Sequence, residues 1–297
     1  MSLYAFFGAI EQGLVFGIMA LGVFITFRAL DFPDLSVDGS FPMGAAISAV
    51  MISSGYNPWV TLIVAVAGGA AAGCVTAMLN TKLKILNLLS GILTMIALYS
   101  VNLRIMGMPN IPLLGFDTIY TSVNIFGLPS YAANVVLLAI IVSLVAGVLI
   151  WFFHTEVGLA LRATGDNMKM VRAQGASTSR MIFFGVALSN GLVALSGALV
   201  GQAQGFADVN MGIGIIVAGL ASVILGEALV SSNGVVKAVI GVILGSIAYR
   251  LAIAVALTLK IGDFRLSPSD LNLITAILVV IALMFPGLRS KIGAVRS

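Results

Sequence analysis

Charged residues are scarce in this sequence. Of its 297 residues, 9% are charged and 60% are hydrophobic, and the mean hydropathy is +1.14. A water-soluble domain contains about 25% charged residues, so this chain has too little polar surface to cover a soluble globule. The composition excludes a soluble enzyme, a nucleic-acid-binding domain and a disordered chain. It predicts an all-α, polytopic integral membrane protein, with membrane lipid as a partner and no nucleic acid.

Cysteine and histidine are almost absent. The chain has one of each, Cys74 and His154. This excludes a disulfide framework and a cysteine-based metal site, and it argues against a histidine-rich metal site. We therefore expect no metal site. The net charge of +4 is accounted for by lysines and arginines that anchor cytoplasmic loops.

Long hydrophobic runs are abundant. Because a membrane-spanning helix needs about 20 mostly apolar residues, the sequence predicts a single transmembrane domain over residues 1–297 with about nine spans. They cover residues 5–27, 42–54, 58–79, 85–106, 131–153, 181–204, 211–230, 236–259 and 270–288. The second run is short, so segment 29–54 could instead form a broken or re-entrant helix.

The distribution of lysine and arginine predicts the orientation. With nine spans and a cytoplasmic C-terminus, eleven of these residues lie on the cytoplasmic side and three outside, which satisfies the positive-inside rule. The eleven are Arg28, Lys82, Lys84, Arg162, Lys169, Arg172, Arg180, Lys237, Arg289, Lys291 and Arg296; the three are Arg104, Lys260 and Arg265. The N-terminus is then outside, residues 107–130 form an outside loop with room for a short helix, and residues 154–180 are cytoplasmic.

Segment 154–180 contains the signals of a short helix. Gly165-Asp166 is typical of a turn, and Asp166 or Asn167 can supply an N-cap for a helix over 167–174. Gly175 then stands where a glycine often ends a helix. Two turns are too short to be stable alone in water, so this helix must pack on its own protein or on a partner.

The same segment resembles the coupling loop of ATP-binding-cassette (ABC) importer permeases, in the family of branched-chain amino acid and simple-sugar permeases. The resemblance rests on Gly158-Leu-Ala-Leu-Arg162-Ala163, on Gly165-Asp166-Asn167, and on Ala173 and Gly175. Two positions depart from the family pattern, Leu159 in place of arginine and Ala176 in place of a larger apolar residue. Both bear on which ATPase is accepted.

Other runs carry the same resemblance through most of the chain. Asp34-Leu35-Ser36-Val37, followed by Gly39-Ser40, is similar to a run in the sugar permeases, although Asp38 is an extra residue. The longer run from Arg28 to Phe41 is closer to a branch that pairs with lipoproteins binding aromatic amino acids. Leu225-Gly226 and Met284-Phe285-Pro286-Gly287 also match the family.

The resemblance implies a type II ABC importer-like permease in the bacterial cytoplasmic (inner) membrane. A second permease copy, in a homodimer, would complete the pore, and an external substrate-binding lipoprotein would deliver the solute. The chain has no G-x-x-x-x-G-K-[ST] phosphate loop, so it is expected to be no enzyme and to hold no cofactor. ATP and Mg²⁺ would be bound by cytoplasmic ABC ATPase subunits, which are separate chains.

Two sets of site residues follow. The resemblance implies that the ATPase is contacted by Arg162, Gly165, Asp166, Asn167, Lys169, Met170, Arg172 and Gly175. Polar residues within or beside apolar runs are candidates for the translocation path: Glu11, Asp34, Ser36, Asp38, Ser40, Asn190, Gln202 and Arg250. Glu11 and Arg250 are predicted to approach each other or to face the pore.

Alternatives stay open for the path residues and for the function. The acids of segment 28–42 could belong to a solvated cytoplasmic loop, and Asn190 and Gln202 could form interhelical hydrogen bonds instead of lining a pore. An ion-coupled secondary transporter or channel could use Glu11, Asp34 and Asp38, but it leaves the short capped helix unexplained. The branch resemblance indicates an amino acid substrate, possibly an aromatic one, with a simple sugar as the alternative.

Overall fold

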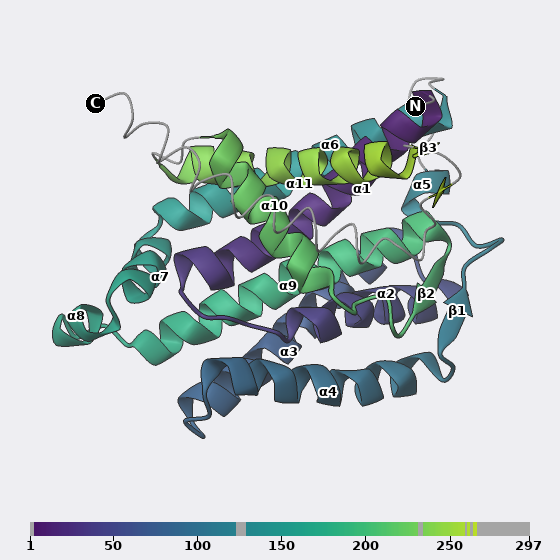
Figure 1. The fold of residues 1–297 in the computed structure, drawn as a ribbon. Helices are drawn as coiled ribbons and strands as arrows, with labels where there is room; N and C mark the ends of the chain where they lie inside the picture. Colours follow the sequence, from purple (N-terminus) through teal and green to yellow (C-terminus); the bar gives the residue numbers. More distant parts are fainter. Residues whose placement is uncertain (1–2, 123–128, 231–233, 259, 262–263, 266–297) are drawn as a thin grey trace, which may run out of the picture.

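Long apolar helices make up most of the chain in the computed structural model (Figure 1). The structure describes residues 3–122, 129–230, 234–258, 260–261 and 264–265. The helices are α1 (Leu3–Phe24), a π-helix (Ile25–Ala29), α2 (Val37–Ser53), α3 (Pro58–Thr81), α4 (Asn87–Met106), α5 (Ile119–Ser122), α6 (Ser130–His154), α7 (Glu156–Asp166), α8 (Met168–Ala173), α9 (Thr178–Gln204), α10 (Ile215–Leu229) and α11 (Val235–Thr258). The strands are β1 (Asn110–Pro112), β2 (Phe206–Asp208), β3 (Lys260–Ile261) and β4 (Phe264–Arg265).

Six helices of the described part are long and apolar enough to cross a membrane. They agree with the predicted spans 5–27, 58–79, 85–106, 131–153, 181–204 and 236–259. Two shorter apolar helices, α2 and α10, correspond to the predicted spans 42–54 and 211–230. The predicted span 270–288 lies outside the described residues, so the total of nine spans stays a prediction.

The start of α2 differs from the prediction. We expected this span to begin at Pro42, after the acids, but the helix begins at Val37 and includes Asp38 and Pro42. Proline has no N–H, so Pro42 leaves the Asp38 carbonyl without its usual helical donor. That carbonyl instead lies against the backbone of Gly212, where an added Cβ would be 2.0 Å from the oxygen. The absence of a side chain at Gly212 thus lets its backbone pack closely on the freed carbonyl.

Helices α1 and α9 lie at the middle of the core, and most helix pairs include one of them. Helix α9 packs against α1, α2 and α3, while α1 also packs against α6, α10 and α11. Small residues let these helices approach closely. At Gly44 of α2, for example, a Cβ would lie 1.9 Å from the carbonyl oxygen of Ala194 on α9. Helix α2 is consequently enclosed by α3, α4 and α9.

The two ends of the bundle carry different structures. At one end lie the start of α1, helix α5 and an antiparallel pair of β1 with β2, with Asn110 opposite Asp208. At the other end lie α7 and α8 (Figure 1). The predicted short helix within 107–130 is thus present as α5. The strand pair was not predicted, because three residues in each strand are too few to show an alternating pattern.

Candidate functional site

The segment between α6 and α9 forms two helices rather than one. Helix α7 begins at Thr155, whose Oγ1 accepts a hydrogen bond from the Gly158 N–H at 3.3 Å. The predicted turn at Gly165-Asp166 is wrong, since both residues belong to the last turn of α7. The physical reason is packing: at Gly165 a Cβ would lie 2.3 Å from the carbonyl oxygen of Ala29. Glycine here brings α7 directly against the end of the π-helix.

The second helix, α8, is the one that the sequence predicted. Its N-cap is Asn167, whose Oδ1 accepts hydrogen bonds from the N–H groups of Lys169 and Met170, both at 3.1 Å. Of the two predicted caps, the structure therefore uses Asn167. The helix ends before Gly175, which has φ of 83° as a terminating glycine should.

Helix α8 is attached by few contacts and leaves most of its side chains free. Val171 is buried, and the Arg172 Nε donates a hydrogen bond to the Thr178 Oγ1 at 2.8 Å. Met170, a large apolar side chain, is 51% exposed. Lys169 is also exposed. A two-turn helix with an exposed methionine beside basic residues has the form of a docking element.

The N-cap allows a direct test of this docking element. Asn167→Ala should weaken co-purification of the predicted ATPase severalfold, because loss of an N-cap costs about 1 kcal/mol of helix stability. Asn167→Asp should retain co-purification, since aspartate caps as well as asparagine. The measurement is the ratio of ATPase to permease after affinity purification in mild detergent. Equal ratios for the alanine and aspartate variants would contradict the role of α8.

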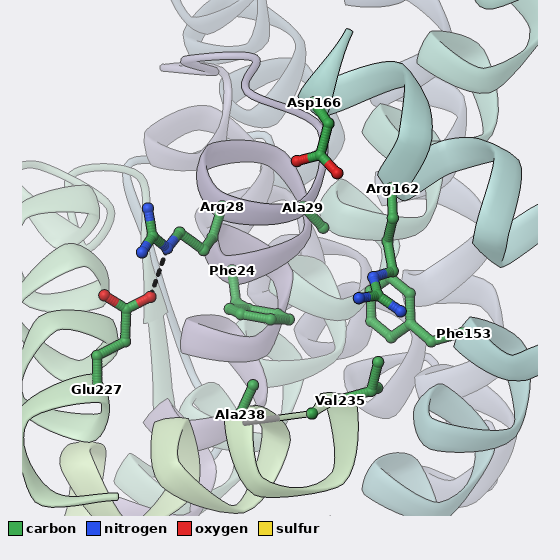
Figure 2. A pocket seen from close by; sticks show the side chains of 10 residues that line it. Phe24, Arg28, Ala29, Phe153, Arg162, Asp166, Glu227, Val235 and Ala238 are labelled. Atoms are coloured by element: carbon green, nitrogen blue, oxygen red, sulfur yellow. Dashed lines mark hydrogen bonds and ion pairs between the residues drawn. The ribbon is translucent and has the colours of Figure 1, made fainter. Parts of the chain in front are cut away.

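A cavity of about 440 Å³ lies beside α7, where α1, α6, α10 and α11 also end. Figure 2 shows that the Arg28 side chain reaches Glu227 of α10, with Arg28 Nε donating to a Glu227 carboxylate oxygen. Phe153, Arg162 and Asp166 also line this cavity. The predicted ATPase contacts Arg162 and Asp166 thus border a polar hollow between the helix ends.

Four of the predicted path residues meet in one buried network. The Asp34 carboxylate accepts hydrogen bonds from Ser36 Oγ at 2.6 Å and from the Asn190 Nδ2 at 2.8 Å. The Ser40 Oγ donates to Asn190 Oδ1 at 2.6 Å. All four side chains have 0% exposure. Because Asn190 lies near the middle of α9, the network ties the non-helical segment 30–36 and the start of α2 to the centre of a membrane span.

This network bears on segment 28–42, for which a solvated loop and a part of the translocation path were both open; a role in the path stays a prediction. Asp34 and Ser36 do not lie in a solvated loop, since neither is exposed. Non-helical backbone at membrane depth is tolerated when it is buried in protein, and here the carboxylate also accepts the Ser36 N–H at 2.9 Å. The segment is therefore a built-in break between α1 and α2.

Asp38 and Gln202 have different surroundings. The two carboxylate oxygens of Asp38 accept the N–H groups of Gly214 and Ile216 at the start of α10, at 3.0 and 2.9 Å. Gln202 accepts the Ile119 N–H at 3.0 Å and donates to Ser48 Oγ at 2.9 Å. Gln202 thus joins α9 to α5 and α2, whereas Asp38 also borders a cavity.

Glu11 and Arg250 do not pair with each other in the part of the chain that the structure describes. The Arg250 guanidinium lies 3.5 Å above the centre of the Phe16 ring, a cation–π arrangement. The Glu11 side chain is hydrogen-bonded to Asn134 of α6. Glu11 and Arg250 therefore do not contact each other, because Glu11 binds a side chain of α6 and Arg250 binds a side chain of α1.

Another cavity, of about 390 Å³, lies between α2, α4 and residues 209–213, and it was not predicted from the sequence. We call it the α2–α4 cavity. Its lining includes Asp38, Tyr99, Ser100 and Asn102. One feature of the sequence pointed to this cavity: Asn102 is a polar residue within an apolar run. The structure shows that its side chain is buried.

Comparison with known proteins agrees with this architecture. The family model described as branched-chain amino acid transport system / permease component matches residues 5–285. The tyrosine transport system permease protein of Clostridioides difficile (strain R20291) is 43% identical over 269 residues, covering 91% of this chain and 87% of that protein.

Two solved structures share the fold. The structure of PsaBC from Streptococcus pneumoniae in complex with Fab aligns with a TM-score of 0.53 at 15% identity, covering 95% of this chain and 91% of the other. A metal-chelate type ABC transporter in an inward-facing conformation aligns with a TM-score of 0.50 at 18% identity, covering 97% and 87%. Since the family model spans nearly the whole chain, this protein belongs to the family of branched-chain amino acid transport system permease components.

Proposed function

We propose that the chain is the membrane-spanning permease subunit of an ABC importer that carries an aromatic amino acid into the bacterial cytoplasm. The observation that supports this substrate most strongly is the 43% identity, over 91% of the chain, to a tyrosine transport system permease. The run from Arg28 to Phe41 points the same way. Hydrolysis of ATP belongs to a separate subunit, because the sequence contains no phosphate loop.

The proposal assigns a side of the membrane to each end of the bundle. Helices α7 and α8 face the cytoplasm and dock on the ATPase, through exposed residues that include Lys169, Met170 and Arg172. The end with β1, β2 and α5 faces outward, toward a substrate-binding lipoprotein. The excess of basic residues in the predicted cytoplasmic loops supports this orientation.

The proposal also includes a second copy of the permease and contact with lipid in the cytoplasmic (inner) membrane. Large apolar side chains are exposed along the outward surfaces of α3 and α6, among them Ile63 at 71%, Leu144 at 65% and Trp151 at 69%. Such surfaces are stable only against lipid or another protein. In a homodimer, the second copy would cover part of this exposed apolar surface, and lipid would cover the rest.

Competition for uptake tests the substrate class. The ATPase and binding protein that co-purify from the native host are expressed with the permease in cells that lack aromatic amino acid uptake. Labelled tyrosine should accumulate, and excess tryptophan or phenylalanine should suppress it, because these amino acids share the aromatic side chain and the zwitterion. Excess leucine or ribose should have little effect. Uptake of leucine or ribose in preference to tyrosine would overturn the aromatic assignment.

A further inference from the structure

Asn102, which lines the α2–α4 cavity, has a buried hydrogen-bond acceptor without a partner in the described part of the chain. The Asn102 side chain has 0% exposure, and its Nδ2 donates to the carbonyl oxygen of Gly39 at 3.0 Å. Its Oδ1 has no hydrogen-bond partner among the residues that the structure describes. An unsatisfied buried acceptor costs about 1–3 kcal/mol, so this oxygen is an expected place for a donor that the chain itself does not supply.

A carboxyl group lies next to this acceptor. Asp38 precedes Gly39, the residue that Asn102 holds, and both Asp38 and Asn102 line the cavity. Two N–H groups at the start of α10 donate hydrogen bonds to the Asp38 carboxylate, one to each oxygen. A carboxylate offers about four lone-pair sites, and those two bonds leave capacity for more. No lysine or arginine of the described chain forms an ion pair with Asp38.

The rest of the lining is apolar and aromatic. Pro42 of α2 and Met95, Ile96 and Tyr99 of α4 form the walls, and Tyr99 is 49% exposed. The volume of about 390 Å³ falls within the range of roughly 300–1,000 Å³ that is usual for small-molecule sites. The cavity thus combines an acceptor-rich, negatively charged end with a broad apolar surface.

We infer that the α2–α4 cavity binds the transported amino acid on its way through this chain. The ammonium group of the substrate donates to Asp38 and Asn102, and its aromatic side chain lies against Tyr99 and Ile96. The inference rests on the proposed function. It also explains how the cavity would distinguish an amino acid from a sugar, since a sugar supplies hydroxyl donors but no cation for Asp38. An aromatic amino acid satisfies the charge, the empty acceptor and the apolar wall together.

Protection of an introduced cysteine tests this site. Ser100 lines the cavity and is exposed, so Ser100→Cys, made in a Cys74→Ser background, places a thiol there with little change in volume. The complete transporter in membranes is treated with 2-aminoethyl methanethiosulfonate. The labelling rate should fall about tenfold when labelled tyrosine saturates the importer at about ten times its apparent Kd, and leucine should give no protection.

Two controls keep the result interpretable. Ser53→Cys, in the same background, is exposed but does not line the cavity, so tyrosine should leave its labelling unchanged. Adding Asp38→Asn to Ser100→Cys should remove the protection and abolish the preference for a cationic over an anionic reagent, since the local negative charge is gone. Asparagine can still accept one of the two α10 hydrogen bonds, which preserves much of the local structure.

The outcomes separate this inference from the proposed function. If the Ser100→Cys protein imports tyrosine but tyrosine does not slow its labelling, the cavity is not the binding site and the proposed function stands. If unmodified transporter imports no aromatic amino acid, the proposed function fails first. Protection by tyrosine that persists in the Asp38→Asn variant would contradict the role given to the carboxylate.

Discussion

ATP-driven uptake should be lost in a Gly165→Ala variant, even though the protein inserts and accumulates normally. An alanine Cβ at this position would lie 2.3 Å from the Ala29 carbonyl oxygen. Backbone cannot move aside as a flexible side chain can, so α7 must shift away from the end of the π-helix. The contact between α7 and the π-helix would then be broken. The measurement is uptake per amount of permease, together with the ATP hydrolysis rate of the purified complex, which should persist without transport.

Gly147→Ala is the matched control for this substitution. Gly147 lies in the interior of α6, and a Cβ there meets nothing within 4 Å. In a helix interior, alanine is favoured over glycine by about 1 kcal/mol, so helix propensity changes in the same direction in both variants. Only Gly165→Ala introduces a clash. Wild-type uptake in the Gly165→Ala variant would show that α7 does not transmit motion through this contact.

The Asp34→Ala variant should show the second large effect, a loss of uptake together with a lower melting temperature in detergent. The substitution removes the acceptor for Ser36 and for the Asn190 Nδ2 within a fully buried network. The Ser36 Oγ can still donate to Asn190 Oδ1 at 3.1 Å, but the Ser36 N–H and one N–H of the Asn190 amide lose their acceptor. Each donor left unpaired costs about 1–3 kcal/mol, and the tie that Asp34 makes between the break and α9 would be lost. Uptake is expected to fall by at least about tenfold, equivalent to roughly 1.4 kcal/mol.

An exposed acid provides the comparison for Asp34. Asp117 lies in the segment between β1 and α5 and is exposed, so Asp117→Ala should change neither uptake nor melting temperature. Thermal unfolding followed by size-exclusion chromatography gives the stability of each variant on the same scale. An Asp34→Ala protein as stable and as active as the Asp117→Ala protein would mean that the buried network has no role in holding the break.

Local signals in the sequence predicted the long helices and α8 well. The spans follow from uninterrupted apolar runs, and the cap at Asn167 together with Gly175 locates α8 to within a residue. Helix α7 was missed because Gly165-Asp166 is locally typical of a turn. The glycine is required by packing on Ala29, a contact between residues far apart in the sequence.

The buried network around Asp34 and the α2–α4 cavity could not be predicted from local sequence patterns. Asp34 and Asn190 were both named as polar residues of the path, but their contact joins positions 156 residues apart. Asn102 passed unnoticed within an apolar run, because only the structure shows that its oxygen is buried without a partner among the described residues. Helix packing creates both features, and no local pattern encodes them.

The source of energy for transport is the most direct test of the central claim, because it separates an ABC importer from an ion-coupled carrier or channel. The permease, its co-purifying ATPase and the binding protein are reconstituted in liposomes, and labelled tyrosine uptake is measured with ATP and without ion gradients. Our account predicts accumulation that requires ATP and stops when the ATPase is omitted. Accumulation driven by a proton or sodium gradient through the permease alone would contradict it.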